Sequence, residues 1–156
     1  MKILVVSDSH GNSAALARIV ERELPFEILV HCGDGVRDLA QLRIPRSVRV
    51  VGVTGNMDRA VVTGREVLEL FELPGFKFLV THGDRQRAHE DYLGLLDEAH
   101  VRGADIVLFG HTHRPFLREG RPSLFNPGAA QQGFYGTVLV SDRIEFFHKR
   151  WEAPPG

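Results

Sequence analysis

KILVVSDSH, residues 2–10, joins a short apolar run directly to polar side chains that are able to bind a metal ion. The run Lys2–Val6 has the length and the β-branched content of a short buried strand. It leads into Asp8-Ser9-His10, where the chain has to turn. Ligands of open α/β sheets gather beyond the strand ends, so the segment predicts a binding site beside a strand of an α/β protein.

Four more segments of the chain repeat this arrangement. Short strands are predicted over the apolar runs Ile28–Val30, Val48–Val53, Phe76–Val80 and Ile106–Phe109. The polar segments associated with these strand ends are Gly33-Asp34, Gly55-Asn56, Thr81-His82-Gly83 and Gly110-His111-Thr112-His113. Five strand ends that all carry Asp, Asn or His predict one site assembled from the whole length of the chain.

The candidate ligands at these strand ends outnumber the four that one tetrahedral zinc ion needs. They are Asp8, His10, Asp34, Asn56, His82, His111 and His113. This set of oxygen and nitrogen donors suits two divalent ions that share a bridging carboxylate. Any one segment alone is ambiguous, because Asp, Asn and Gly are also ordinary turn residues. The five segments together favour the metal site.

The remaining histidines are expected to have other roles. His31 lies on the same predicted strand as Asp34 and is a candidate to contact a metal ligand. His89, His100 and His148 lie outside the five segments and are expected to be surface or structural residues.

The other elements alternate between helices and strands early in the chain and form hairpins late in it. Helices are predicted over Ser13–Glu23, with Asn12 or Ser13 as the N-cap, over Val36–Leu42, and from about Tyr92 to about Arg102. The predicted hairpins are Val67–Leu73 with Phe76–His82, Phe116–Arg118 with Ser123–Phe125, and Phe134–Ser141 with Ile144–Trp151.

Length and composition are those of a one-domain globular protein. The chain has 156 residues, of which 43% are hydrophobic and 25% charged. We expect a single domain over residues 1–152 and a disordered tail over residues 153–156. The formal net charge of -1 gives no basic field, which argues against binding to long nucleic acids. A nucleotide remains open as a substrate, since metal ions supply local positive charge.

Cysteine usage and hydropathy bear on the compartment. The single cysteine, Cys32, cannot form an internal disulfide and is expected to be a buried, inert thiol, which fits a reducing compartment. No apolar run is long enough to span a membrane, and no signal peptide precedes the first strand. These features predict a cytoplasmic protein with no membrane partner, and they leave self-association open.

The ordered set Asp-x-His, Gly-Asp, Gly-Asn, His and Gly-His-x-His resembles the calcineurin-like metallophosphoesterases and covers nearly the entire chain. The small size, Gly55-Asn56-Met57-Asp58 and Asn126-Pro127-Gly128 resemble the compact, cap-less phosphodiesterase branch of that superfamily. The resemblance implies a four-layer α/β/β/α sandwich of two mixed β-sheets flanked by helices. The pattern alone predicts only an α/β fold.

The resemblance also implies a role for each candidate ligand. Asp34 would bridge two divalent ions. Asp8, His10 and His113 would complete the first ion site, and Asn56, His82 and His111 the second. Asp34, Asn56 and His82 would then act in catalysis through the metals. Mixed imidazole and carboxylate ligation suits Mn above all, with Fe, Ni, Co or Zn as alternatives, and argues against a pure Mg or Ca site.

The function implied is hydrolysis of a small phosphoester, most simply a phosphodiester, by a hydroxide that bridges the two metals, and a nucleotide is one candidate substrate. The alternative is a non-catalytic protein-binding scaffold of the same fold, like the retromer scaffold subunit. A competent ligand type at every ligand position favours the enzyme.

Met57 departs from the wider superfamily, in which many phosphomonoesterases have a proton-donating His after the Gly-Asn pair. Methionine cannot donate a proton, so the leaving group is expected to get little help from a side chain at this position. Asp58 is expected to orient a ligand. Arg59, Arg85 and Arg114 each follow a motif closely and are candidates to bind substrate oxygens.

Overall fold

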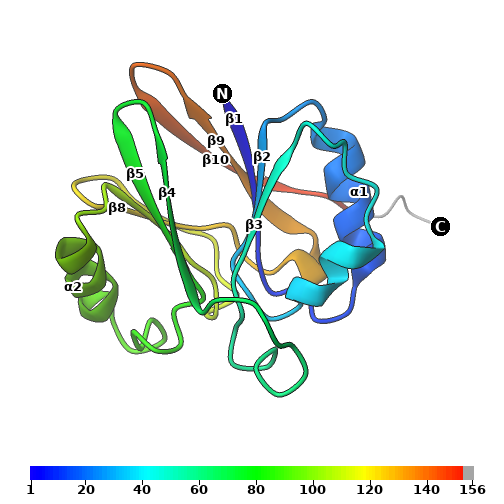
Figure 1. The fold of residues 1–156 in the computed structure, drawn as a ribbon, viewed down its shortest axis with the longest axis horizontal. Coiled ribbons are helices and arrows are strands. Elements are labelled where there is room, and N and C mark those ends of the chain that lie inside the picture. Colours follow the sequence, from blue (N-terminus) through cyan, green and yellow to red (C-terminus); the bar gives the residue numbers. More distant parts are fainter. Residues whose placement is uncertain (153–156) are drawn as a thin grey trace.

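Two five-stranded sheets form the centre of the computed structural model, which describes residues 1–152 (Figure 1). Sheet A has the spatial order β10-β9-β1-β2-β3. Its strands are β1 Lys2–Val6, β2 Ile28–His31, β3 Arg49–Gly52, β9 Phe134–Val140 and β10 Ile144–Arg150. β1, β2 and β3 run parallel, whereas β9 pairs antiparallel with both β1 and β10. The tail expected over residues 153–156 lies outside the described residues.

Sheet B has the spatial order β4-β5-β6-β8-β7. Its strands are β4 Leu68–Leu73, β5 Phe76–Thr81, β6 Ile106–Leu108, β7 Phe116–Arg118 and β8 Ser123–Asn126. β5, β6 and β8 run parallel, and the antiparallel strands β4 and β7 form the two edges. Both sheets are therefore mixed.

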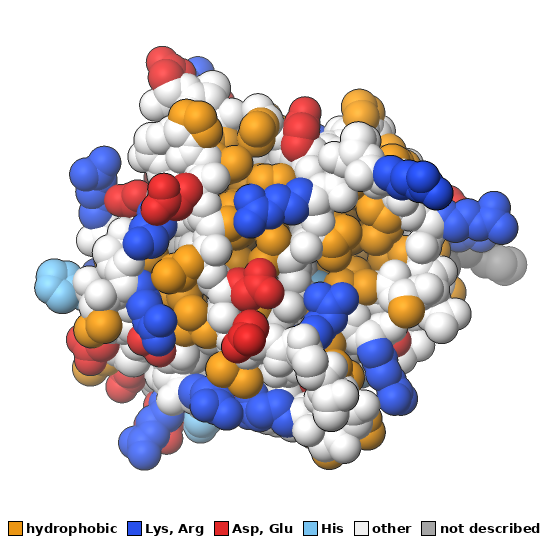
Figure 2. All heavy atoms as spheres, in the orientation of Figure 1, with side chains coloured by type: hydrophobic (Ala, Val, Ile, Leu, Met, Phe, Trp, Pro, Cys, Tyr) orange, Lys and Arg blue, Asp and Glu red, His pale blue; other side chains and the backbone are white. Residues whose placement is uncertain are grey.

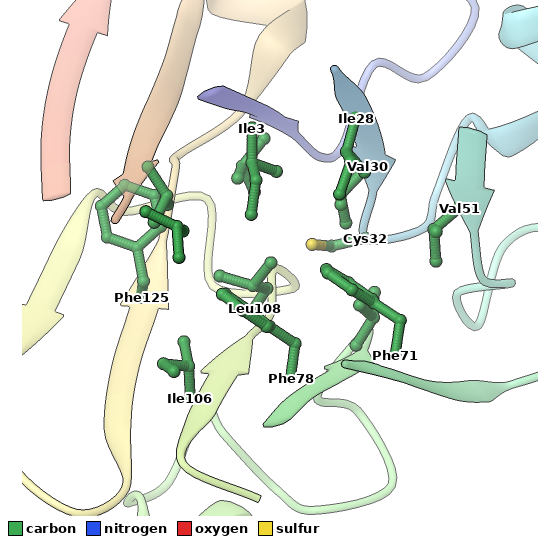
Figure 3. Packing of buried hydrophobic residues seen from close by; sticks show 14 of the residues in the cluster. Ile3, Ile28, Val30, Cys32, Val51, Phe71, Phe78, Ile106, Leu108 and Phe125 are labelled. Atoms are coloured by element: carbon green, nitrogen blue, oxygen red, sulfur yellow. The ribbon is translucent and has the colours of Figure 1, made fainter. Parts of the chain in front are cut away.

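The two sheets pack face to face because alternate side chains of each strand point to the same side. Ile3 and Val5 of β1 belong to one buried cluster with Phe78 of β5 and Leu108 of β6. Side chains of β1, β2 and β3 lie across from those of sheet B in this core (Figure 3). Cys32 is fully buried with its sulfur pointing into the same core, which confirms the expected buried thiol.

Helices cover the outer faces of both sheets. Leu4 and Val6 of β1 pack outward in a cluster that includes Leu16 and Ile19 of α1 (Ser13–Glu23). On the outer face of sheet B, α2 (Leu93–Arg102) packs through buried Leu95 and Ala99, in a cluster with Leu79 and Val107. The layers follow the order helix, sheet, sheet, helix, which confirms the four-layer α/β/β/α sandwich.

The helix predicted over Val36–Leu42 is instead a 3₁₀-helix, η1, over Val36–Gln41. The amide of Asp38 bonds the carbonyl of Gly35, and the amide of Leu42 bonds that of Leu39. Both are i→i−3 bonds, which are the 3₁₀ pattern and are common in segments this short. A further short 3₁₀-helix, η2 (Ala130–Gln132), was not predicted.

Two other boundaries differ from or refine the sequence expectations. The strand predicted over Val48–Val53 covers only Arg49–Gly52, since the Val48 amide bonds the Pro45 carbonyl in a turn. Asn12 is the N-cap of α1, and its side-chain oxygen accepts a hydrogen bond from the Ala15 amide at 3.1 Å.

The surface carries no single-sign field on the face drawn in Figure 2, where Lys and Arg side chains are interspersed with Asp and Glu. Within residues 1–152, no helix has both the length and the apolar character that a membrane crossing requires. The carboxyl ends of β1, β2 and β3 in sheet A, and of β5 and β6 in sheet B, lead into the five polar segments. Side chains from four of those segments meet at one place between the sheets.

Candidate metal centre

Six of the seven candidate ligands form two triads of potential metal-binding atoms. The first triad contains Asp8, His10 and His113, and the second contains Asp34, His82 and His111. In each triad the ligating atoms lie within 4.8 Å of one another. Each triad combines a residue from the loops after sheet A with one from the loops after sheet B.

The first triad surrounds one carboxylate oxygen. Asp8 Oδ1 lies 3.2 Å from His113 Nε2 and 3.6 Å from His10 Nε2. The two imidazole Nε2 atoms are 3.2 Å apart. These separations are those of ligands that each lie about 2.0–2.2 Å from a shared ion. Asp8 Oδ1 is buried and has no hydrogen-bond partner. A buried oxygen without a partner is rare and needs an explanation, for which a cation is the simplest occupant.

The second triad centres on His82. Its Nδ1 lies 2.8 Å from the Cys32 carbonyl, to which it donates a hydrogen bond, and this leaves Nε2 to face the cluster. His82 Nε2 lies 3.2 Å from Asp34 Oδ2 and 3.3 Å from His111 Nδ1. It is also 3.9 Å from Asp8 Oδ1, so the two triads are adjacent.

The charges of the second triad are coupled. Burial disfavours protonation of His82, but the Asp34 and Asp8 carboxylates outweigh it and raise the pKa of His82. Burial opposes ionisation of Asp34 as well, yet His82 and then the Met57 amide and His10 lower the pKa of Asp34. Burial, followed by the neighbouring His82, lowers the pKa of His111. An ionised Asp34 and a neutral His111 are the forms that bind metal.

The backbone is strained at five of the candidate ligands. The φ angles are 53° at Asp8, 45° at His10, 57° at Asp34, 71° at His111 and 62° at His113. These values are left-handed, a conformation that costs an L-residue about 1–2 kcal/mol. Within residues 1–152 only one other non-glycine residue has a positive φ. Strained backbone persists only where surrounding contacts hold it in place, and such residues are typically clustered at functional sites.

Two glycines permit the close approach of other backbone to the carboxylates. A Cβ atom at Gly110 would lie 2.0 Å from Ser7 Oγ and 2.6 Å from Asp8 Oδ2. A Cβ atom at Gly55 would lie 2.2 Å from Asp34 Oδ1. Both positions therefore require a residue without a side chain.

Asp58 fastens two of the strand-end loops to each other. Its carboxylate accepts hydrogen bonds from the amides of Asp34 at 2.7 Å, Gly35 at 2.8 Å and Gly55 at 2.9 Å. The side chain is buried, and these contacts join the loop after β2 to the loop after β3. Asp58 thus acts on the position of Asp34 and does not itself belong to either triad.

His31 joins the loops after β1 and β2 in a buried chain of hydrogen bonds. The Gly33 amide donates to His31 Nδ1 at 3.0 Å, and His31 Nε2 lies 3.0 Å from Ser9 Oγ. Ser9 donates to Asp38 Oδ2 at 2.7 Å, which also accepts the Gly11 amide at 2.8 Å. Burial lowers the pKa of His31 to about 4, so its ring is neutral and donates through Nε2.

Asn56 and Met57 lie at the solvent side of the cluster. The Asn56 side chain is exposed, and it follows Gly55, whose backbone touches the Asp34 carboxylate. The Met57 side chain is 62% exposed, and its amide donates to Asp34 Oδ1 at 2.8 Å.

The three candidate arginines occupy different places. Arg59 forms an ion pair with Asp84, and its Nη1 is buried without a partner. Arg114 is exposed and lines a cavity together with His111. Arg85 lines a separate cavity against α2 and β4, whose wall contains none of the six clustered ligands. The fold therefore does not bring Arg85 to the cluster.

Some supporting residues carry no sequence signal that could have identified their roles. Ser7 donates to Asp8 Oδ2 at 2.6 Å. Asn126 donates to the Gly110 carbonyl at 3.0 Å and to Thr112 Oγ1 at 3.1 Å, and so holds the loop that carries His111 and His113.

The histidines outside the cluster differ among themselves. His148 is structural, as expected, because its ring stacks on Phe125 and its Nε2 lies 2.8 Å from the Asn126 carbonyl. His89 is exposed, also as expected, but its ring lies edge-on to that of His111. His89 therefore borders the site, which the sequence did not indicate.

Comparisons with known proteins identify similar sequences. Residues 1–142 match the family profile of the calcineurin-like phosphoesterase superfamily domain. A probable metallophosphoesterase of Bacillus subtilis is 34% identical over 131 residues, which are 83% of this chain and 75% of that protein. A phosphodiesterase of Methanocaldococcus jannaschii is 27% identical over 145 residues, which are 82% of this chain and 83% of that protein.

Solved structures agree on the fold. A predicted phosphoesterase from Streptococcus pneumoniae superposes with a TM-score of 0.74 at 28% identity, covering 96% of this chain and 92% of the other. The protein Vps29 from Entamoeba histolytica, solved in complex with zinc, superposes with a TM-score of 0.72 at 19% identity, covering 96% and 99%.

Proposed function

Because this chain belongs to the calcineurin-like phosphoesterase superfamily, we propose that it is a phosphodiesterase that works with two divalent metal ions. The observation that supports this proposal most strongly is the pair of adjacent triads, in which buried Asp8 Oδ1 has no partner. An oxygen of this kind, facing two imidazole Nε2 atoms, fits a cation better than any hydrogen-bond donor among the described residues.

The donor set also fits the proposed ions. Asp8, His10 and His113 would hold one ion, and His82, His111 and the amide of Asn56 would hold the other. Asp34 would bridge them, and its pKa is sensitive to His82 of one triad and His10 of the other. Imidazoles mixed with carboxylates suit Mn, with Fe, Ni, Co or Zn as alternatives.

When bound, such ions neutralise phosphate oxygens and lower the pKa of water, so that it attacks phosphorus near neutral pH. The chain itself would supply position. The Met57 amide fixes Asp34 Oδ1, and the Cys32 carbonyl fixes the ring of His82. Asp58 would hold Asp34 in its left-handed conformation. Arg114 would bind an outer phosphate oxygen, since it lines a cavity together with His111, and the buried Arg59 Nη1 without a partner is the candidate to bind another.

The choice of diesters rests on Met57. A simple alkyl monoester has a poor leaving group, and general acid catalysis typically contributes about 10²–10⁴-fold. Met57 cannot provide it, so diesters with acidic leaving groups are the better substrates. The phosphodiesterase name of the Methanocaldococcus relative points the same way.

The proposal is tested by metal analysis and hydrolysis together. After reconstitution with Mn, the protein should hold close to two ions per chain and should hydrolyse bis(4-nitrophenyl) phosphate. Asp34→Asn should lose at least about 10²-fold in turnover, because it disrupts the bridge. Among residues 1–152, the exposed Asp142 side chain accepts a hydrogen bond only from the adjacent Ser141, so Asp142→Asn is the matched control.

A metal content near zero in the wild type would contradict the metal proposal. Normal turnover in Asp34→Asn would show that the site has been assigned to the wrong residues. Two bound ions without hydrolysis of any diester would instead favour the scaffold alternative.

A further inference from the structure

A cavity of about 380 Å³ lies beside the second triad and shares the His111 side chain with it. Its walls come from the turn and helix start around residues 88–92 and from the loop around residues 111–114. We call it the 88–92 cavity. A phosphodiester held at the cluster would have one of its ester groups at the mouth of this cavity.

Three of the eight residues that line the 88–92 cavity carry aromatic rings, namely His89, Tyr92 and His111. The His89 ring meets the His111 ring edge-on, with centroids 5.4 Å apart and an interplanar angle of 74°. Tyr92 stacks on Phe116, with centroids 4.2 Å apart, and meets Phe109 edge-on at 6.0 Å. This packing fixes the Tyr92 ring before any ligand arrives, so little side-chain entropy is lost on binding.

The polar groups of the cavity differ in whether they already have hydrogen-bond or ion-pair partners. Thr112 Oγ1 already accepts hydrogen bonds from Asn126 Nδ2 at 3.1 Å and from the Arg114 amide at 3.2 Å. Arg114 lines the cavity, and its side chain forms no ion pair within residues 1–152.

The wall also contains two acidic residues, Glu90 and Asp91. Asp91 Oδ1 accepts a hydrogen bond from the Leu93 amide at 3.0 Å, and Glu90 Oε1 lies 3.7 Å from His89 Nε2. The rings favour a flat aromatic group over a second aliphatic chain, and the acidic residues are able to accept hydrogen bonds from donors on its edge.

We propose that the 88–92 cavity binds the planar aromatic part of a substrate's ester group, either an aryl ring or the base of an esterified nucleoside, while the phosphate of that substrate lies at the metal centre. This inference rests on the proposed function, because the phosphate must be held at the two triads. Stacking of a base on aromatic side chains should strengthen binding by about 5- to 100-fold relative to a methyl group.

Two phosphonates test the cavity without any hydrolysis. Calorimetry on Mn-loaded protein gives the Kd of phenylphosphonate and of methylphosphonate, which share the same anionic head. The wild type should bind phenylphosphonate at least about 5-fold more tightly. His89→Ala and Tyr92→Leu should each bring the ratio toward one. His100→Ala, at an exposed position on α2, is the control and should keep the wild-type ratio.

A wild-type ratio near one, a ratio unchanged in both cavity variants, or no binding of either phosphonate would overturn the inference. His89 is exposed, so His89→Ala remains informative even if Tyr92→Leu disturbs the packing on Phe116. Selective binding of phenylphosphonate without hydrolysis of any diester would refute the phosphodiesterase proposal and leave the aryl-binding cavity standing.

Discussion

Replacing Asp58 by asparagine tests whether this carboxylate holds Asp34 in position. Three amides converge on it, those of Asp34, Gly35 and Gly55. In its best orientation, the asparagine side chain places its oxygen at the position of Oδ2 and keeps the hydrogen bonds from the Asp34 and Gly55 amides. Its NH₂ group then faces the Gly35 amide, so that two hydrogen-bond donors oppose each other. The variant loses one bond to a charged group and weakens two others.

The size of the effect follows from the energy of such bonds. A hydrogen bond to a charged group contributes about 1.5–3 kcal/mol, against about 1 kcal/mol for a neutral one. Gly35 is only partly buried, which lets water relieve some of the loss. We expect Asp58→Asn to lower the free energy of unfolding by about 2–4 kcal/mol, or the Tm by about 5–15 °C. Because Asp34 is no longer held, Mn affinity should fall by about 10- to 100-fold.

Urea unfolding of metal-free protein measures the first effect, and titration with Mn of the folded protein measures the second. Asp105 is the matched control, because its carboxylate accepts the Lys77 amide at 2.8 Å at the start of β5, opposite the ligand-bearing end. Asp105→Asn should lose stability and keep its Mn affinity. Equal Mn affinities of Asp58→Asn and the wild type, with reduced stability, would refute the positioning role. A stability of Asp58→Asn equal to that of the wild type would contradict the stabilising contribution of these hydrogen bonds.

Three further changes test other parts of the argument. Met57→His supplies a proton donor where the side chain is 62% exposed. Across aryl esters of rising leaving-group pKa, the kcat/KM of this variant should then fall less steeply than that of the wild type. Equal slopes would mean that another proton donor already acts. Gly110→Ala should weaken Mn binding by at least about 10-fold, because its Cβ would lie 2.6 Å from Asp8 Oδ2; undiminished binding in a metal titration would contradict the close approach. Burial opposes ionisation of Glu23, but Tyr135 and two lysines lower the pKa of Glu23 to about 2. The ionised carboxylate therefore stabilises the folded protein above about pH 4.5, and this contribution is lost as the pH falls toward 2. Glu23→Gln should therefore cost about 2 kcal/mol at pH 7 and flatten the acid branch of the stability curve, and an unaltered acid branch in urea titrations would contradict this.

The sequence predicted the strands that carry the ligands because each is a short apolar run that ends in a polar turn. Such a signal depends only on residues that are adjacent in the sequence, and a short apolar run of this kind fits few structures other than a buried strand. The same signal identified Asp8 and His111 as partners of one site, although only the fold brings them together. The pattern could not assign β8 to its place between β6 and β7, because that pairing depends on strands distant in sequence.

Positions that depend on loop direction were the least predictable. Arg85 and His89 both follow His82 within a few residues, yet Arg85 lines a cavity away from the cluster and His89 lies against His111. The chain turns several times between residues 83 and 91, and no periodicity reports the direction of a side chain there. The role of Asp58 was predicted only in outline, since its three amide donors come from two different loops.

The way sheet A closes has a consequence for the order in which a newly made chain can reach its final form. β1 is the central strand of sheet A, and one of its two neighbours is β9, which is made more than a hundred residues later. His10 and His113 are likewise separated by 103 positions. At about 5–20 residues per second, the ribosome delivers His113 roughly 5–20 s after His10. Until β9 has been made, the backbone groups of β1 that pair with it have no partner strand, and the parallel strands of sheet A lack their antiparallel neighbour. Neither of the two proposed ion sites is therefore complete before residues 111–113 have been made.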